Sequence, residues 1–182
     1  DISSFYLKSL YEVNFNIISV YSQPPRKKGR GMFLQESPVQ QFSVKKNINV
    51  CTPTDLNSEV VKKNIKKLKP DLIIVMGYGL KIPQYILELP VFGCINIHVS
   101  LLPRWRGAAP IEYALMNNDN DTGITIFKLI SEMDAGPIIA KKSIPIKQDI
   151  NKEDLIKELN FEGIKLLKNT IPKIFNDKIT YE

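Results

Sequence analysis

The run "DLIIVM", residues 71–76, is the segment of this sequence that most clearly indicates a fold class. It is a continuous apolar run after its first residue, and it shows no alternation of apolar and polar side chains. Such runs are typical of strands in a parallel sheet that is covered on both faces. The run "CINIH", residues 94–98, is a second segment of this kind. The two runs therefore predict strands of a buried, parallel sheet.

The segments on either side of these runs alternate between strand and helix patterns. Short runs of β-branched and aromatic residues predict two more strands, at 16–21 and 48–52. Amphipathic spacing and end signals predict five helices, at 4–13, 38–46, 57–69, 107–117 and 153–168. Two alternating runs, at 123–130 and 136–146, predict an antiparallel pair. The fold class predicted is therefore α/β, with a doubly wound, mostly parallel, Rossmann-like sheet and an antiparallel extension.

Length and composition indicate a globular domain and argue against a membrane-spanning, secreted or metal-binding protein. The 182 residues suffice for one domain with its own core. No apolar run approaches the roughly 20 residues of a membrane span, and no secretory signal leads the chain. Cys51 and Cys94 lack metal-ligand spacing and indicate reduced thiols in a cytoplasmic protein, and we expect no metal site. The net charge of +6 permits a polyanionic partner and equally fits a lysine-rich, solvated surface.

A candidate site is predicted beyond the carboxyl ends of the parallel strands. In doubly wound sheets, ligands bind in the crevice at these ends. Three segments that leave strand ends are predicted to be loops, at 22–36, 77–83 and 98–110. The first contains "QPPRKKGRG", residues 23–31, in which proline, glycine and basic residues break all periodicity. We expect the site to be built from these three loops.

Two polar residues interrupt the strand predicted at 94–98. Alternate residues of a strand share a face, so Asn96 and His98 point to one side, and Ile95 and Ile97 point to the other. The pair would lie at a strand end, where the crevice is expected. Taken alone, it also fits a strand end whose side chains only satisfy backbone groups.

Asp134 favours the catalytic interpretation of this pair. It lies in "MDAG", a tight connection between the two alternating runs, from which a carboxylate could reach the imidazole. A carboxylate orients a histidine and favours its charged form, and an Asn96 N–H could stabilise an oxyanion. No serine or cysteine is placed as a nucleophile, so these residues fit direct acyl transfer to an incoming nucleophile. A turn-forming role for Asp134 remains open on these grounds.

The segment "NIHVSLLPRWRGAAPI", followed by "MDAGPI", resembles the formyltransferase family that uses 10-formyltetrahydrofolate. The resemblance rests on the N-x-H, SLLP and D-x-G motifs and covers essentially the whole chain. It implies Asn96, His98 and Asp134 as the catalytic residues. It also implies two groups of residues at the folate co-substrate: Ser100, Leu101, Leu102 and Pro103 in SLLP, and Gly77, Tyr78 and Gly79 in "GYGLKIP".

Two segments resemble one branch of that family. "LLPRWRGAAPI" and "QPPRKKGRGMFLQESPV" are similar to the members that formylate initiator methionyl-tRNA for translation initiation. In those members the basic loop reaches toward the tRNA acceptor end. The resemblance therefore implies tRNA contacts by four basic residues: Arg26, Lys27, Lys28 and Arg30. Cations on a loop can pair with phosphates, and the same residues would also fit a merely solvated loop.

The resemblance also implies which part of the family's fold this chain contains. At two positions the sequence differs from the family's usual residues. It implies that residues 1–182 form the catalytic domain without the family's first strand and without its C-terminal β-barrel. Pro25 stands where aspartate is usual, which bears on the conformation of the basic loop. Val99 stands where a small residue or proline is usual, which bears on the folate site.

Two other functions remain open at this point. The acceptor could be glycinamide ribonucleotide, an amino sugar or water, none of which needs a long basic loop. The chain could instead be a non-catalytic, basic nucleic-acid-binding module, which would explain the charge but not the pattern of Asn96, His98 and Asp134. For the formyltransferase interpretation we expect a monomer in the cytoplasm of a bacterium or an organelle, with no membrane contact.

Overall fold

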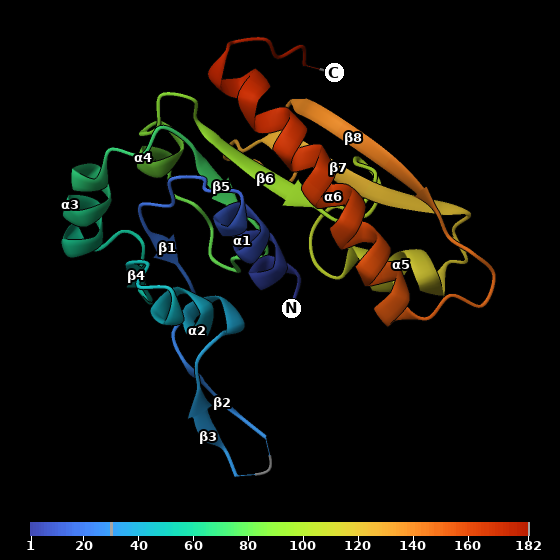
Figure 1. The fold of residues 1–182 in the computed structure, drawn as a ribbon, viewed down its shortest axis with the longest axis horizontal. Helices are drawn as coiled ribbons and strands as arrows, with labels where there is room; N and C mark the ends of the chain where they lie inside the picture. Colours follow the sequence, from blue (N-terminus) through green and yellow to red (C-terminus); the bar gives the residue numbers. More distant parts are fainter. Residues whose placement is uncertain (30, 182) are drawn as a thin grey trace. The chain divides into compact units, whose positions relative to one another are not determined.

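The computed structural model describes residues 1–29 and 31–181 (Figure 1). The chain forms two compact units. The first contains Asp1–Pro70 and Gly77–Pro83, and the second contains Asp71–Met76 and the chain from Gln84 onward. In the described part of the chain, no helix is both long and apolar enough to cross a membrane.

The first unit contains a short parallel pair of strands with three helices. Strand β1 (Val20–Tyr21) pairs with β4 (Val50–Cys51), so both predicted strands are present but shorter than their apolar runs. The helices are α1 (Ile2–Glu12), α2 (Pro38–Lys45) and α3 (Glu59–Leu68). All three helices agree with the sequence prediction, because each begins at a residue suited to a helix start and has an apolar stripe.

Local contacts explain where two of these helices begin. The side chain of Asp1 accepts a hydrogen bond from the Ser4 N–H at 2.8 Å and forms a capping box at the start of α1. Ser37 accepts from the Gln40 N–H at 3.0 Å, and Pro38 occupies the first turn of α2. The predicted start of this helix at residue 38 is therefore confirmed.

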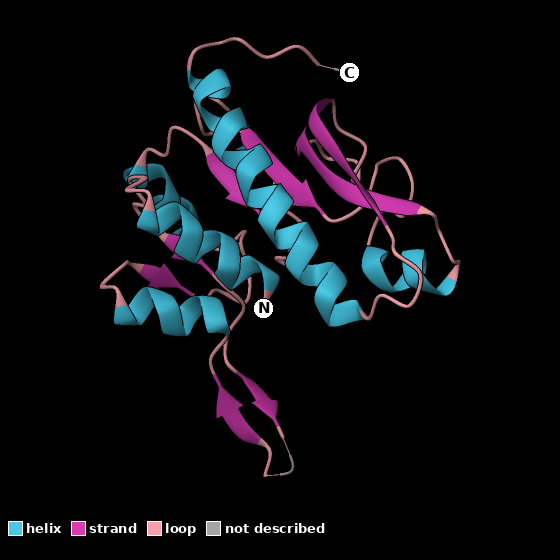
Figure 2. Ribbon diagram, turned by 45° about the vertical axis from the view of Figure 1, so that its right-hand side comes forward, coloured by secondary structure: helices cyan, strands magenta, loops and turns pink. Residues whose placement is uncertain are grey.

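The prediction of a loop over 22–36 is wrong in part. Residues Arg26–Lys28 form strand β2, which pairs in antiparallel fashion with β3 (Phe33–Gln35). All six strand residues are exposed, and the two strands form a sheet of their own (Figure 2). Because neither face of this hairpin is buried, nothing selects an alternation of apolar and polar residues. The sequence pattern therefore gave no strand signal.

The second unit contains a four-stranded sheet in the order β5–β6–β7–β8 (Figure 1). Its strands are β5 (Ile73–Val75), β6 (Cys94–His98), β7 (Asp121–Lys128) and β8 (Ile138–Pro145). The β5–β6 pair is parallel, and the β6–β7 and β7–β8 pairs are antiparallel. The predicted antiparallel extension is therefore confirmed.

The described part of the second unit contains three helices, and the longest of them packs along the sheet. These are α4 (Gln84–Leu87), α5 (Pro110–Met116) and α6 (Lys152–Phe175). Helix α6 lies along the sheet in both ribbon views (Figures 1 and 2). It was predicted to end at 168 but continues through Pro172, because Ile171 and Ile174 are buried and extend its apolar face.

Strand β6 lies inside this sheet, and β5 lies at its edge. Ile95 and Ile97 are 1% and 3% exposed, as the apolar run predicted. The prediction that 71–76 is buried on both faces is wrong, because Ile73–Val75 are only half-buried. Strand β5 is paired only with β6 in this sheet, so it lacks a second strand neighbour to cover its side chains. Strand β6, which ends at His98, is therefore an inner strand of this sheet.

Candidate active site

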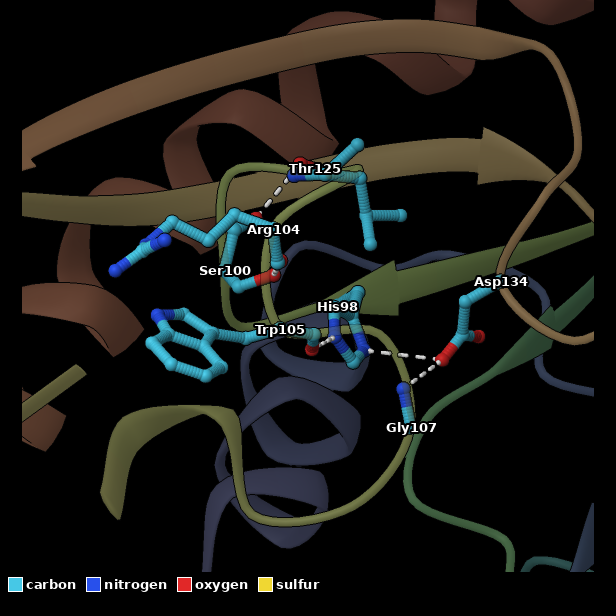
Figure 3. A network of polar contacts seen from close by, with 8 residues as sticks. His98, Ser100, Arg104, Trp105, Gly107, Thr125 and Asp134 are labelled. Atoms are coloured by element: carbon cyan, nitrogen blue, oxygen red, sulfur yellow. Dashed lines mark hydrogen bonds and ion pairs between the residues drawn. The ribbon is translucent and has the colours of Figure 1, made fainter. Parts of the chain in front are cut away.

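His98 and Asp134 face each other in the second unit (Figure 3). His98 is the last residue of β6, and Asp134 lies in the connection between β7 and β8. His98 Nδ1 and Asp134 Oδ2 are 3.8 Å apart, and the two side chains are 8% and 13% exposed. Asn96 lies two residues before His98 on the same strand and is half-buried. The structure thus brings together the imidazole and carboxylate of the predicted catalytic set.

The carboxylate of Asp134 also holds a backbone group. Its Oδ2 atom accepts a hydrogen bond from the Gly107 N–H at 2.8 Å (Figure 3). Asp134 has a φ of 47° and Gly107 a φ of 85°, so both lie in the left-handed region. One oxygen of Asp134 therefore contacts both the imidazole and the loop that follows β6. A structural role of this residue exists beside any catalytic one.

The second ring nitrogen of His98 is also engaged. His98 Nε2 lies 2.8 Å from the backbone carbonyl oxygen of Trp105. A carbonyl can only accept a hydrogen bond, so Nε2 carries a hydrogen. In a neutral imidazole, Nδ1 then carries a lone pair toward Asp134. A second proton at Nδ1 would make the ring cationic and would lie beside the carboxylate. At 3.8 Å the carboxylate can stabilise that charged ring electrostatically.

Thr125 of β7 makes two hydrogen bonds to the backbone of the loop that connects β6 to α5. Thr125 Oγ1 donates to the Ser100 carbonyl at 2.7 Å and accepts from the Leu102 N–H at 3.0 Å. The Ser100 hydroxyl donates to the Arg104 carbonyl at 2.6 Å. Ser100 and Leu102 are buried, whereas Leu101 is half-buried and Pro103 is exposed. Of the four SLLP residues, Leu101 and Pro103 are therefore the ones whose side chains remain accessible.

We expect Thr125→Val to lower the free energy of unfolding by about 2 kcal/mol or more. The substitution keeps the volume but leaves the Ser100 carbonyl and the Leu102 N–H buried without partners, at about 1–3 kcal/mol for each group. Equilibrium unfolding in urea measures the difference. Thr122→Val is the matched control on the same strand, because Thr122 Oγ1 is buried and has no hydrogen-bond partner among the described residues. We expect that control to be neutral or stabilising, and equal losses in the two variants would contradict the role of Thr125.

The other predicted folate segment lies in the first unit. Gly77 and Gly79 have φ values of 56° and 81°, which favour glycine, and the Tyr78 carbonyl accepts from Gln23 Nε2 at 2.6 Å. Burial raises the pKa of Tyr78. The basic residues Arg26, Lys27 and Lys28 also belong to the first unit, on the exposed hairpin. Arg30 lies outside the described residues.

The second unit also carries a groove of about 400 Å³ beside α4. Leu87 and Glu88 line one side, and Leu129, Ile130 and Ser131 line the other. The segment 129–131 precedes Asp134 in the same β7–β8 connection. No sequence motif pointed to this groove, because its lining comes from residues scattered over three segments. Within the described residues, no group of three or more histidine, cysteine or acidic side chains could hold a metal ion.

Comparison with known proteins gives a consistent result. A family model described as formyl transferase matches residues 6–171. A methionyl-tRNA formyltransferase from Kosmotoga olearia is 44% identical over 174 residues, which are 96% of this chain and 56% of that protein. One from Dictyoglomus thermophilum is 43% identical over 180 residues, which are 98% of this chain and 57% of that protein. The chain thus spans somewhat more than half the length of these relatives.

The fold also matches solved structures. A phosphoribosylglycinamide formyltransferase from Anaplasma phagocytophilum superimposes with a TM-score of 0.81 and 21% identity, covering 97% of this chain and 84% of that one. At this identity the similarity concerns the fold alone. It confirms the predicted Rossmann-like α/β fold with parallel and antiparallel strands.

Proposed function

Because the chain belongs to the formyl transferase family, we propose that residues 1–182 are the catalytic domain of an enzyme that formylates methionyl-tRNA. The enzyme would transfer the formyl group of 10-formyltetrahydrofolate to the α-amine of the charged initiator tRNA. The observation that carries this proposal is the 44% identity to a methionyl-tRNA formyltransferase over 96% of the chain, which includes the His98–Asp134 pair. A monomer in the cytoplasm of a bacterium or an organelle fits this function.

In the proposed reaction, the amine nitrogen attacks the formyl carbon directly. A new C–N bond forms, the bond between the formyl carbon and N10 of the folate breaks, and the amine loses a proton. Asn96 and a protonated His98 stabilise the negative charge that develops on the formyl oxygen. Asp134 stabilises the imidazolium and accepts or passes on the proton, and N10 of tetrahydrofolate receives one proton in exchange. The 3.8 Å approach of Nδ1 to Oδ2 supports this division of roles.

Two segments are proposed to contact the folate. Leu101 and Pro103 present accessible apolar surface next to the His98 loop, and Ser100 and Leu102 set the shape of that loop from inside. In the first unit, the segment Gly77, Tyr78 and Gly79 offers backbone polar groups at two exposed glycines. Apolar side chains with a few backbone polar groups are the usual lining for a flat, heterocyclic ligand.

The exposed hairpin is proposed to contact tRNA. Its basic residues Arg26, Lys27 and Lys28 lie on a strand with no buried face. Arg30, two residues further along the sequence, belongs to the same proposal. Phosphate contacts by such side chains position a nucleic acid and make binding salt-dependent. An amine acceptor of small size, such as glycinamide ribonucleotide or an amino sugar, would gain nothing from them.

We expect simultaneous alanine substitution of Arg26, Lys27 and Lys28 to raise KM for the tRNA about 10-fold or more and to leave kcat nearly unchanged. The expected loss grows as salt is lowered, and the slope of log affinity against log salt falls by about 2 to 3, because up to three phosphate contacts disappear. A matched control replaces three exposed lysines of α3, Lys63, Lys66 and Lys67, which removes the same charge from another surface. If both variants behave alike, net charge rather than the hairpin is responsible.

The proposed function is tested with the full-length protein that contains these residues. It is incubated with 10-formyltetrahydrofolate and each of four acceptors: initiator methionyl-tRNA, elongator methionyl-tRNA, glycinamide ribonucleotide and water alone. Formyl-methionyl-tRNA as the main product, with a preference for the initiator, is the expected result. Formylated glycinamide ribonucleotide or free formate as the main product would assign another acceptor. Binding of tRNA without any transfer would instead support the non-catalytic module.

A further inference from the structure

The carboxylate of Asp119 receives three hydrogen bonds at one point of the second unit. Arg104 donates through Nε at 2.8 Å and through Nη2 at 2.5 Å, and the indole N–H of Trp105 donates at 2.7 Å. The Asp119 side chain is 10% exposed, and its backbone N–H is bound to the Ala114 carbonyl at 3.0 Å. The hydrogen bonds from Arg104 lower the pKa of this carboxyl, so Asp119 is ionised at neutral pH.

Trp105 is held in a conformation that it would not adopt alone. Its φ is 59°, in the left-handed region, which is unfavourable for a non-glycine residue. Side-chain contacts offset that cost. The indole ring stacks on Tyr113 at a centroid distance of 5.3 Å and an angle of 13°, and the Arg104 guanidinium lies 4.4 Å from its centroid. The Asp119 carboxylate fixes the remaining, polar edge of the ring.

The backbone of Trp105 connects this cluster to the candidate active site. Its carbonyl is the group that lies 2.8 Å from His98 Nε2, and two residues later the Gly107 N–H binds Asp134 (Figure 3). The direction of the Trp105 carbonyl depends on the φ and ψ angles of residues 105 and 106. Those angles are set by the side chain that Asp119 anchors. A displacement of the indole therefore reaches the imidazole through one residue of backbone.

We propose that Asp119 is a positioning residue for His98, and that it acts by anchoring the Trp105 indole so that the Trp105 carbonyl fixes the imidazole through Nε2. The inference rests on the proposed catalytic role of His98. Stability alone does not explain the cluster. Arg104 is 56% exposed, and an ion pair with one partner in solvent contributes little to stability. The contribution of Asp119 is to hold the Trp105 indole, and with it the Trp105 carbonyl, in a fixed position.

The test compares three substitutions in the full-length protein. Asp119→Ala removes the anchor, Asp119→Asn keeps one acceptor for the indole N–H, and Trp105→Phe keeps the stacking ring but removes that N–H. Glu162→Gln is the matched control, because it breaks the Glu162–Lys165 ion pair on α6 and touches none of these residues. For each variant, kcat and KM are measured. In addition, ¹⁵N NMR of the imidazole reports which ring nitrogen of His98 carries the hydrogen. The His98 signals are assigned by their loss in His98→Asn.

We expect Asp119→Ala and Trp105→Phe to lower kcat by about 10-fold to 100-fold with KM changed by less than about 3-fold, because a small misplacement of a catalytic group costs rate rather than binding. We expect Asp119→Asn to retain more activity than Asp119→Ala. The His98 signals should move in both Asp119→Ala and Trp105→Phe. A double variant that combines these two substitutions should lose little more kcat than either single variant. Glu162→Gln should behave as wild type.

Three outcomes separate this inference from the proposed function. A lower kcat with unchanged His98 signals in folded protein would overturn the positioning role of Asp119. Additive losses in the double variant would overturn the route through Trp105. His98 signals that move while kcat stays at the wild-type value would support the positioning role and contradict the catalytic role of His98. If Asp119→Ala fails to fold, Asp119→Asn and Trp105→Phe still decide between these results.

Discussion

Replacement of His98 with asparagine is expected to lower kcat for formyl transfer by about 100-fold to 1000-fold. The imidazole is 8% exposed and lies between the Asp134 carboxylate and the Trp105 carbonyl, and the substitution removes the ring that makes both contacts. Loss of one group that stabilises an oxyanion has this magnitude in acyl transfer. Single-turnover assays with 10-formyltetrahydrofolate and initiator methionyl-tRNA measure the chemical step separately from product release.

Asn96→Ala is expected to cause a loss of similar size, because Asn96 lies on the same face of β6 and offers the amide N–H of the proposed pair. Asn64→Ala, an exposed asparagine on α3, is the matched control. Thermal unfolding at an unchanged midpoint shows that each variant is folded. Turnover within about 3-fold of wild type in both His98→Asn and Asn96→Ala would falsify the catalytic assignment.

The second large effect concerns Gly136, which follows Asp134 in the β7–β8 connection. A Cβ atom at this position would overlap with the backbone carbonyl oxygen of Lys128. That carbonyl cannot move freely, because the Lys128 N–H is bonded to the Pro137 carbonyl at 2.9 Å within the same pair of strands. We expect Gly136→Ala to lower the free energy of unfolding by about 3 kcal/mol or more, as for other forced clashes with rigid neighbours.

Equilibrium unfolding in urea measures this loss, and formyl transfer measures its effect on Asp134. Gly29→Ala in the exposed hairpin is the control: its Cβ would meet no atom within 4 Å, but its φ of 77° still disfavours alanine. We expect a cost of about 1 kcal/mol there, from backbone conformation alone. A loss in Gly136→Ala no larger than that in the control would show that the connection can rearrange around a side chain.

The sequence predicted the position of Asn96 and His98, the proposed catalytic pair of β6, because strand geometry is regular. The spacing of Asn96 and His98 places them on one face of any strand, and the flanking Ile95 and Ile97 indicated where that strand is buried. Asp134 could be included because it lies in a short connection between two alternating runs. These signals are local, so they do not depend on how the rest of the chain folds.

The remaining parts of the site carry no such signal. The carbonyl of Trp105 and the N–H of Gly107 are backbone groups that every residue has, and only the folded loop directs them at His98 and Asp134. Asp119 is far from the motifs in sequence and reaches them through an indole ring. The hairpin β2–β3 was missed for another reason, since strands with two exposed faces show no periodicity.

The same oxygen of Asp134 faces His98 and accepts a hydrogen bond from Gly107. The charge of this carboxylate therefore affects how firmly the backbone at Gly107 is held. A hydrogen bond to a carboxylate is roughly twice as strong as one to a neutral acceptor. If Asp134 takes up a proton in the proposed reaction, its hydrogen bond from the Gly107 N–H becomes weaker. Residues 100–102 remain tied to Thr125, so the loosening is confined to the segment around residue 107. In each cycle of the proposed reaction, the backbone at Gly107 would become more mobile when Asp134 is protonated and less mobile when the proton leaves.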